Sequence, residues 1–150
     1  MKKLSDLLVE ATEVVINIPL PPVDCKPNTH KHWRAKSKAI KQAREEAFNA
    51  GMEARLKYGP LKPPVVVHHS WYMAADPTEG AKGHPKRYRP LDEGNAIAAL
   101  KGSIDGLVDS GLLEGDSHTL LKWGEGRLYR AMADHHGSHC VVLRIERMQP

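Results

Sequence analysis

Apolar and polar residues are arranged as in β-strands in several stretches of the chain. Residues 13–20 alternate β-branched apolar positions with polar ones, which predicts a strand with one buried face, bounded by prolines. Residues 63–73 are apolar enough at their centre to predict a buried strand. Nearer the C-terminus, 127–132 and 140–147 predict the two strands of a closing hairpin, with a turn at 135–138.

A long helix is predicted between the first two strands. From Trp33 to Leu56 the chain is rich in Ala, Lys, Arg and Glu and contains no proline, which favours a helix. Apolar residues at helical spacing predict one buried stripe along it, made of Ala39, Ile40, Ala43, Ala47 and Phe48.

A second, shorter helix is predicted around position 100. Asp92 or Asn95 can cap its N-terminus, because a short side-chain oxygen accepts hydrogen bonds from unpaired backbone N–H groups of the first turn. Gly111 is placed to end the helix, since glycine readily adopts the left-handed conformation that follows many helices. One side of this helix collects the apolar positions and forms its core face, made of Ile97, Leu100, Ile104, Leu107 and Val108.

The composition indicates one domain rather than several. A chain of 150 residues, 41% of them hydrophobic, can form a single domain over residues 1–150 with a core of its own. We expect an α+β fold in which a small mixed β-sheet packs against two main helices. No apolar run approaches the roughly 20 residues of a membrane span, and Asp6 and Glu10 argue against a signal peptide. With only Cys25 and Cys140 present, a reduced, cytoplasmic protein is expected.

Basic residues are concentrated before and within the long helix. The chain has 22 Lys and Arg against 18 Asp and Glu, and the segment from Lys26 to Arg44 contains several basic residues and no acid. One interpretation is a solvated helix face. The other is a surface for the phosphate backbone of DNA, which the one-signed charge beside His32 and Trp33 favours. The basic loop over 74–90 is also expected to contact DNA.

Acidic residues gather on the second helix and on the segment that follows it. Lys101 and Asp105 stand four residues apart on a side of the helix away from its core face, and Asp109 follows four residues later. Glu114 and Asp116 follow the helix, in a segment that is expected to turn back beside it. The lysine and Asp105 either form a surface ion pair or work together, with the lysine facing a phosphate while carboxylates hold a metal ion.

Two groups of histidines are weaker candidates for a metal site. His68 and His69 are adjacent in a predicted strand, so their side chains point to opposite faces, and we interpret them as ordinary strand histidines. A structural zinc needs four tetrahedral ligands, and the segment 135–140 contains no C-x-x-C pair. A polar hairpin tip is therefore favoured there. The alternative is a zinc-stabilised interaction module with the candidate ligands His135, His136, His139 and Cys140.

The acidic segment resembles the core of a nuclease family. Its most specific part is the stretch DGLVDSGLLEGD, and the full pattern is Asp92-x-x-Asn95-x5-Lys101-x3-Asp105-Gly106-Leu107-Val108-Asp109-x-Gly111-x-Leu113-x-x-Asp116. This pattern is similar to that of the RusA-type endodeoxyribonucleases, the phage and prophage Holliday junction resolvases. Upstream, a strand that ends in prolines and a basic helix resemble the phage-borne members, as do Asn28, His32, Trp33 and Lys36.

The resemblance implies a metal-dependent endonuclease that acts on branched DNA in recombination and repair. It implies a RusA-like homodimer in a bacterial host cell, which holds a four-way junction and hydrolyses one phosphodiester in each of two opposed strands. The metal expected is Mg²⁺ or Mn²⁺, held by Asp92, Asp105 and Asp116, with Lys101 facing the phosphate as a further catalytic residue. From the resemblance or from their charge, the residues expected to contact DNA are Asn28, His32, Trp33, Lys36, Lys86, Arg87, Arg89 and Asn95.

The chain departs from the family pattern at a position that matters for metal binding. The family has a second aspartate directly before the asparagine, and this chain has Gly94 there. The spacing from the asparagine to the lysine is also longer than usual, and the late pair of acids is reduced to Gly115 and Asp116. Glu93 or Asp105 can compensate for the missing carboxylate. The alternative function is a branched-DNA-binding protein of the same family that has no catalytic activity.

Overall fold

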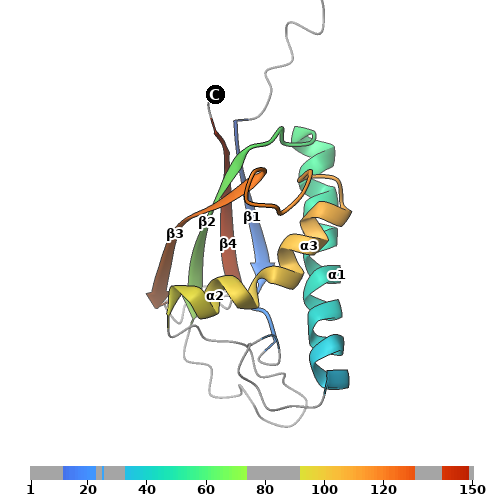
Figure 1. Cartoon of the computed structure of the whole chain (residues 1–150), viewed down its shortest axis with the longest axis vertical. Helices are drawn as coiled ribbons and strands as arrows, with labels where there is room; N and C mark the ends of the chain where they lie inside the picture. The colour runs from blue at the N-terminus through green and yellow to red at the C-terminus, as the bar shows by residue number, and fades with distance from the viewer. Residues whose placement is uncertain (1–11, 23–24, 26–32, 74–91, 131–139, 149–150) are drawn as a thin grey trace, which may run out of the picture.

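The computed structural model describes residues 12–22, 25, 33–73, 92–130 and 140–148 of the chain. In these ranges, four strands form one mixed sheet and three helices pack beside it (Figure 1). The elements in chain order are β1 (Glu13–Pro19), α1 (Trp33–Tyr58), β2 (Val65–Met73), α2 (Glu93–Ala99), α3 (Lys101–Asp109), β3 (Leu121–Arg130) and β4 (Cys140–Arg147). The predicted α+β class is confirmed, and so are the first two strands and the long helix.

The strand order of the sheet is β1-β4-β2-β3, so the strand that comes last in the chain lies inside the sheet. β4 pairs antiparallel with both β1 and β2, while β3 pairs parallel with β2 at an edge. The predicted hairpin of 127–132 with 140–147 is therefore wrong, because these two strands are not neighbours. The central place suits β4, since its alternate residues Val141, Leu143 and Ile145 are buried completely and need packing partners on both sides.

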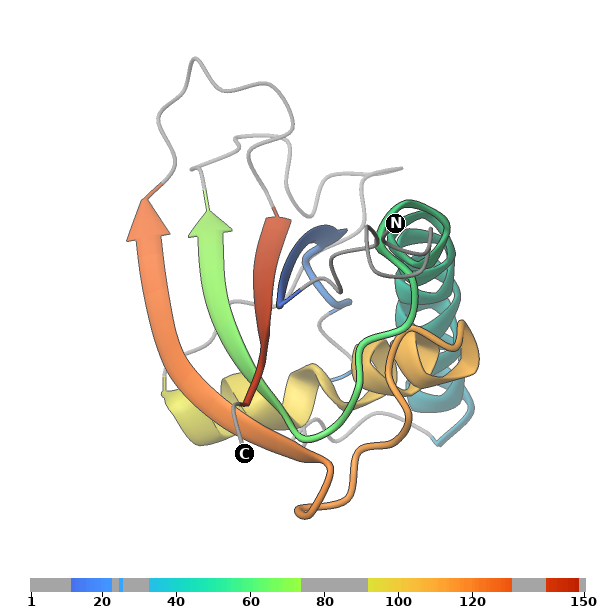
Figure 2. The ribbon, with the colours of Figure 1, turned by 90° about the horizontal axis from the view of Figure 1, so that it is seen from above.

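The core lies between the sheet and the helices. In β1, Val14, Ile16 and Ile18 are buried, and the intervening residues are exposed, as expected for a strand with one solvated face. Seen from above in Figure 2, the helices gather on one side of the curved sheet. Apolar side chains from that side of the strands meet buried residues of all three helices in one cluster.

Small residues let α1 and α3 approach each other closely. At the contact, the residue of α3 that faces α1 is Gly106, which has no side chain. A Cβ atom at this position would overlap the Arg44 carbonyl oxygen and would lie 3.0 Å from the Ala47 Cβ. The same Arg44 pairs its guanidinium with Asp109, and its Nη2 lies 2.8 Å from Asp109 Oδ1. The buried face of α1 is correspondingly small, made of Ala39, Ala43, Ala47, Gly51 and Ala54.

The buried stripe predicted for α1 is wrong at two of its five positions. Ile40 is 42% exposed and Phe48 is 38% exposed, whereas the three predicted alanines are buried. Alanine and glycine occupy the centre of the close contact with α3, while Ile40 lies against Gly102 of α3, where an added Cβ would be 3.2 Å from Ile40 Cγ2. With this polar and basic composition, neither α1 nor any other described helix is long and apolar enough to cross a membrane.

The second predicted helix is present but divided at Leu100 into α2 and α3. Asp92 caps α2, because its Oδ1 accepts a hydrogen bond of 2.8 Å from the backbone N–H of Asn95. Gly111 follows α3 with a φ angle of 81°, the left-handed conformation predicted for it. Three of the five predicted core residues are buried and the other two are half-buried: Leu100, Ile104 and Leu107, then Ile97 and Val108.

Candidate functional site

Lys101, the first residue of α3, lies between two carboxylates. Its Nζ is 3.2 Å from Asp105 Oδ1, one helical turn further on, and it also donates a hydrogen bond to Asp116 Oδ2. The structure thus brings together three of the residues that the sequence pattern singled out. We call Lys101, Asp105 and Asp116 the lysine group.

Buried leucines fix the segment that carries Asp116 back to α3. The chain reverses at Gly111, and Leu112 and Leu113 then enter the core, where each is at most 2% exposed. The carbonyl oxygen of Leu112 accepts a hydrogen bond of 2.9 Å from the backbone N–H of Leu61, in the segment that precedes β2. Asp116 is therefore held near Lys101 by the packing of this segment as well as by the ion pair.

The charges in the lysine group stabilise one another. The hydrogen bond that Lys101 donates to Asp116 is the main cause that raises the pKa of Lys101 above its ordinary value of 10.5, although partial burial opposes it. The same bond lowers the pKa of Asp116 below its ordinary value of 3.8. Two carboxylates face one ammonium, so the group keeps an excess of negative charge with which to attract a cation.

The Lys101–Asp116 pair predicts a small acid-dependent loss of stability. The folded pKa of Asp116 lies below its unfolded value, so the pair stabilises the fold above about pH 3.8 and ceases to do so as the pH falls through the folded pKa. We expect Lys101→Met to lower the free energy of unfolding by at most about 1 kcal/mol at neutral pH, since both side chains are solvent-exposed, and by less in acid. Urea denaturation at a series of pH values measures this difference. Lys122→Met, on β3 outside the lysine group, is the control, and a difference for Lys101→Met that stays constant into acid would contradict the prediction.

A pocket of about 440 Å³ opens beside the lysine group. Lys101 and Asp116 supply its charged side, and β3 contributes Trp123, which is half-buried. The remaining lining is apolar and comes from the α2–α3 region and the start of β3: Ile97, Ala98, Ile104 and Leu121. A ligand could therefore reach the charged pair without displacing the core.

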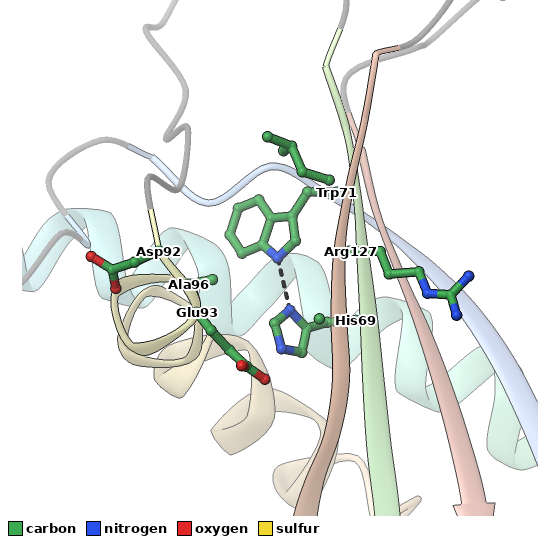
Figure 3. A pocket seen from close by; sticks show the side chains of 8 residues that line it. His69, Trp71, Asp92, Glu93, Ala96 and Arg127 are labelled. Atoms are coloured by element: carbon green, nitrogen blue, oxygen red, sulfur yellow. Dashed lines mark hydrogen bonds between the residues drawn. The ribbon is translucent and has the colours of Figure 1, made fainter.

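Asp92 lies at the other end of α2, away from the lysine group. Both of its carboxylate oxygens accept hydrogen bonds of 2.8 Å from Asn95, one from the backbone N–H and one from the side-chain amide. Asn95 thus orients Asp92 rather than standing free. Together with Glu93, Asp92 lines a separate pocket of about 160 Å³ between α2 and the strands β2 and β3, shown in Figure 3.

His69 forms the wall of this pocket opposite the two acids (Figure 3). It is 1% exposed, and its Nδ1 accepts a hydrogen bond of 2.9 Å from the indole N–H of Trp71. Burial lowers the pKa of His69 below 6.5, although the charge of Glu93 opposes the shift. Its other ring nitrogen, Nε2, has no hydrogen-bond partner in the described parts of the chain.

The two histidines of β2 do point to opposite faces, as predicted. His68 lies on the open face, where its Nδ1 accepts a hydrogen bond of 3.0 Å from the Glu125 backbone N–H and its Nε2 lies 3.2 Å from Glu146 Oε2. The sequence pattern predicts ordinary strand histidines at both positions and does not single out His69. Its signal was available, because strand alternation places His69 on the same buried face as Val67 and Trp71.

Carboxylate oxygens are the donors that Mg²⁺ takes, and both ends of α2 supply them. Mg²⁺ is commonly held by one or two carboxylates, with water and substrate phosphates completing its coordination. Asp105 and Asp116 offer such a pair at Lys101, and Asp92 and Glu93 line the other pocket. Over the described ranges, no three His, Cys, Asp or Glu side chains are grouped as metal ligands. That Asp92, Asp105 and Asp116 share one ion therefore stays a prediction.

Only part of the expected DNA surface lies within the described residues. Trp33, at the start of α1, is 65% exposed, and the Arg34 guanidinium lies 5.4 Å from the centre of its ring. Lys36 is half-buried in the same turn region. The other residues expected on DNA upstream of Asp92 lie outside the described ranges: Asn28, His32, Lys86, Arg87 and Arg89.

The alternative zinc site also falls mostly outside the described residues. His135, His136 and His139 are not described, and Cys140 begins β4 as a half-buried free cysteine. Burial raises the pKa of the Cys140 thiol, which disfavours the thiolate form that binds metals. The described end of this segment therefore gives no support to zinc binding.

Comparison with known proteins identifies a relative but no function. No model of a known protein family matches the chain. An uncharacterized protein from Xylella fastidiosa (strain Temecula1) is 32% identical over 95 residues, which are 63% of this chain. The matched region spans 56% of the length of that protein. The similarity therefore covers little more than half of the relative.

Proposed function

We propose that the chain is a Mg²⁺-dependent endodeoxyribonuclease of the RusA type, which resolves four-way DNA junctions by paired phosphodiester hydrolysis. The observation that carries the proposal is the convergence of Asp105 and Asp116 on Lys101. These residues come from separate parts of the pattern that resembles the family. An ordinary surface ion pair on a helix would need only Lys101 and Asp105, so the second carboxylate, Asp116 from another segment, calls for a further explanation. The group's excess of negative charge suits a bound cation, and such a cation would in turn attract a substrate that is itself anionic.

The chain's own groups account for the binding and orientation of a phosphodiester. An ammonium group has three N–H donors, and Asp105 and Asp116 take two of those of Lys101, so one remains for a phosphoryl oxygen. There it would stabilise the negative charge that develops during hydrolysis. When bound to the carboxylates, Mg²⁺ supplies charge neutralisation and activation of a water molecule.

A homodimer is part of the proposal, because two opposed strands must be cut. A two-fold symmetric dimer presents two identical sites, which matches the approximate symmetry of a four-way junction. The basic stretch that leads into α1, with exposed Trp33 at its start, supplies groups suited to the DNA backbone. Specific contacts to phosphates position DNA without requiring a particular base sequence.

One experiment tests the proposed activity directly. Purified protein is incubated with a synthetic four-way junction and with a linear duplex of matched sequence, each with and without Mg²⁺. We expect symmetric nicks on the junction, dependent on Mg²⁺, and none on the duplex. Cutting that persists in EDTA, or that does not distinguish the junction from the duplex, would count against a resolvase.

The second candidate is a branched-DNA-binding protein without catalysis, and Gly94 favours it. The residue at this position is exposed and provides no carboxylate, while Asp92 has both oxygens bonded to Asn95. This alternative predicts a mobility shift with the junction that weakens steeply with salt, since released counterions drive binding. It also predicts no nicking in either Mg²⁺ or Mn²⁺, which separates it from the nuclease.

A further inference from the structure

The pocket between α2 and the strands β2 and β3 has one wall that is fixed by the sheet, and this wall contains His69. Trp71 orients the imidazole by its hydrogen bond to Nδ1, and the ring meets that of Trp123 with centroids 5.7 Å apart and planes at 89°. On β3, Gly126 leaves the space that the imidazole fills, because a Cβ there would lie 2.5 Å from Cε1. The orientation of His69 is therefore set before any ligand arrives.

The hydrogen bond from Trp71 determines which nitrogen of His69 carries the proton. An indole N–H only donates, so Nδ1 must accept, and the neutral ring then carries its proton on Nε2. Burial lowers the pKa of His69, which favours this neutral form. Nε2–H is thus a buried donor with no acceptor among the residues that the structure describes. Such a donor is costly and rare, so the pocket that His69 lines calls for an acceptor from a ligand.

The charges around the pocket favour an uncharged ligand. A cation finds no ligand in Nε2, because that nitrogen is protonated, and an anion is repelled by Glu93, whose charge acts on His69. The Asp92 carboxylate lies on the far side of the start of α2, and the Arg127 guanidinium extends away from the pocket (Figure 3). Neither of them brings its charge into the space in front of the imidazole. The acceptor is therefore expected to be a neutral carbonyl oxygen or ring nitrogen.

The size and the walls of the pocket suit one flat ring. Its volume is about 160 Å³, and an apolar cavity of about 150 Å³ in a protein holds one benzene molecule. The lining away from the charged groups is formed by Trp71, Ala96, Gly126 and Leu128. Leu128 is 56% exposed, so this side of the pocket is open to solvent. Glu93, at the end of the pocket nearest Nε2, is exposed as well, and its side chain can turn to admit a ligand.

We propose that this pocket binds one nucleobase of the DNA substrate, unpaired and turned out of its helix. His69 donates Nε2–H to an acceptor on the pairing edge of the base, and Glu93 accepts from the N–H group beside that acceptor. Every base presents an acceptor next to a donor on this edge, and proteins that extrude a base read it there while apolar side chains cover its ring. The inference rests on the proposed function, because it adds a second contact to the same DNA. A branch point, where stacking is interrupted, lowers the cost of unpairing a base.

The first test uses uncharged ligands, without metal or DNA. The four 2′-deoxynucleosides are titrated separately into the ¹⁵N-labelled full chain, and the imidazole signals of His69 are followed by NMR. We expect a proton on Nε2 and none on Nδ1. At least one nucleoside should shift the Nε2–H signal saturably in the millimolar range, while 2-deoxyribose leaves it unmoved. A proton on Nδ1, or the absence of a saturable shift with every nucleoside, would overturn the inference.

Two further results of the same titration would assign the donor to another acceptor. Acetamide that shifts the Nε2–H signal as strongly as the nucleosides do would show that the pocket recognises an amide of a protein partner. Glu93→Gln that moves this signal, without ligand, by as much as a saturating nucleoside does would show that Glu93 itself is the acceptor. Either result overturns the inference.

Variants separate the pocket from the rest of the surface, with binding measured by saturation transfer from the protein to the nucleoside protons. His69→Phe keeps a flat ring but removes the donor, and it should weaken binding by about fivefold or more. Ala96→Leu fills the pocket without removing a hydrogen-bonding group, and it should abolish binding, which keeps the proposal testable where His69→Phe weakens the fold. His68→Gln, on the open face, and Glu114→Gln are controls and should bind as the unaltered protein does. Unchanged binding by folded Ala96→Leu would place the nucleoside elsewhere and overturn the inference.

A second experiment connects the pocket to DNA. Abasic sites replace the nucleotides at the branch point of a four-way junction one position at a time, and junction affinity is measured by mobility shift. At one position in the junction, loss of the base should weaken binding by the unaltered protein by about fivefold and leave binding by Ala96→Leu unchanged, since the filled pocket has no base to lose. Equal effects on the two proteins at every position would overturn the inference.

These outcomes are distinguishable from those for the proposed nuclease. Nucleoside binding that depends on His69 and Ala96, together with the abasic effect but without any nicking, supports the inference and counts against the nuclease. Metal-dependent nicking of the junction by a protein that binds no nucleoside supports the nuclease and overturns the inference.

Discussion

Asp116→Asn is expected to abolish Mg²⁺-dependent cleavage of the four-way junction while junction binding persists. The substitution removes the carboxylate that pairs with Lys101 and that would hold the metal, but it keeps the size of the side chain. Loss of one stabilising group of this kind lowers turnover by about 10²–10³-fold or more. Binding should remain or strengthen slightly, because one negative charge is removed near the DNA. Nicking assays and mobility shifts on the same preparation measure both effects.

Glu114→Gln is the matched control for this prediction. It removes the same charge from the same segment, two residues away, on an exposed side chain that is not a hydrogen-bond partner of Lys101. Its cleavage rate should stay close to that of the unaltered protein. Undiminished cleavage by Asp116→Asn would show that the lysine group takes no part in catalysis. Loss of junction binding by a folded Asp116→Asn protein would also contradict the proposed catalytic role.

Gly106→Ala is expected to destabilise the fold by about 2–3 kcal/mol, even though alanine favours a helix over glycine. The added methyl group would overlap the Arg44 carbonyl oxygen and crowd the Ala47 Cβ, so α3 must move away from α1. That movement would also stretch the pairing of Arg44 with Asp109. Urea or thermal denaturation measures the loss.

Gly94→Ala makes the same chemical change in α2 without the crowding. Among the described residues, a Cβ at Gly94 would contact only Asp92 Oδ1, at an ordinary distance of 3.5 Å. Here the helix preference of alanine should prevail, and the stability should rise by about 0.5 kcal/mol. Equal effects of the two substitutions would show that close packing of α1 and α3 is not what requires glycine at 106.

The predictions that succeeded are those that local physics decides. Alternation in β1, the composition of α1 and the Asp92 cap each depend on residues close in sequence. Strand pairing is different, because it depends on which edges are available after the whole chain has collapsed. The segments 127–132 and 140–147 were identified as strands, but nothing near them shows that β4 pairs with β1 and β2 instead.

The prediction of buried residues was wrong where the size of a side chain mattered more than its polarity. Ile40 and Phe48 are apolar and correctly spaced, yet they stay partly exposed, while Gly102 and Gly106 bring the backbone of α3 close to α1 at these positions. A pattern of apolar positions cannot show how near the facing element will come. The glycine inside the DGLVD stretch was the available signal, because a conformationally costly residue in a helix usually has a packing reason.

The candidate site was predicted in part. Lys101, Asp105 and Asp116 were selected from the pattern, and the structure places them together. The placement of Asp92 in a different pocket depends on the break at Leu100 and on the length of α2, which the pattern did not reveal. The hydrogen bond from Trp71 that orients the ring of His69 could not be predicted from the pattern, because it depends on the positions of the side chains in the folded sheet.

The insertion of β4 between β1 and β2 has a consequence for the biosynthesis of the protein. Until residues 140–147 have been synthesised, the inner edges of both strands lack their partner, so the emerging chain cannot complete its sheet on the ribosome. Contacts between β1 and β4 also join nearly opposite ends of the chain, which makes folding slow relative to helical proteins of this size. Premature termination before β4 should therefore yield an aggregation-prone fragment rather than a shorter folded protein.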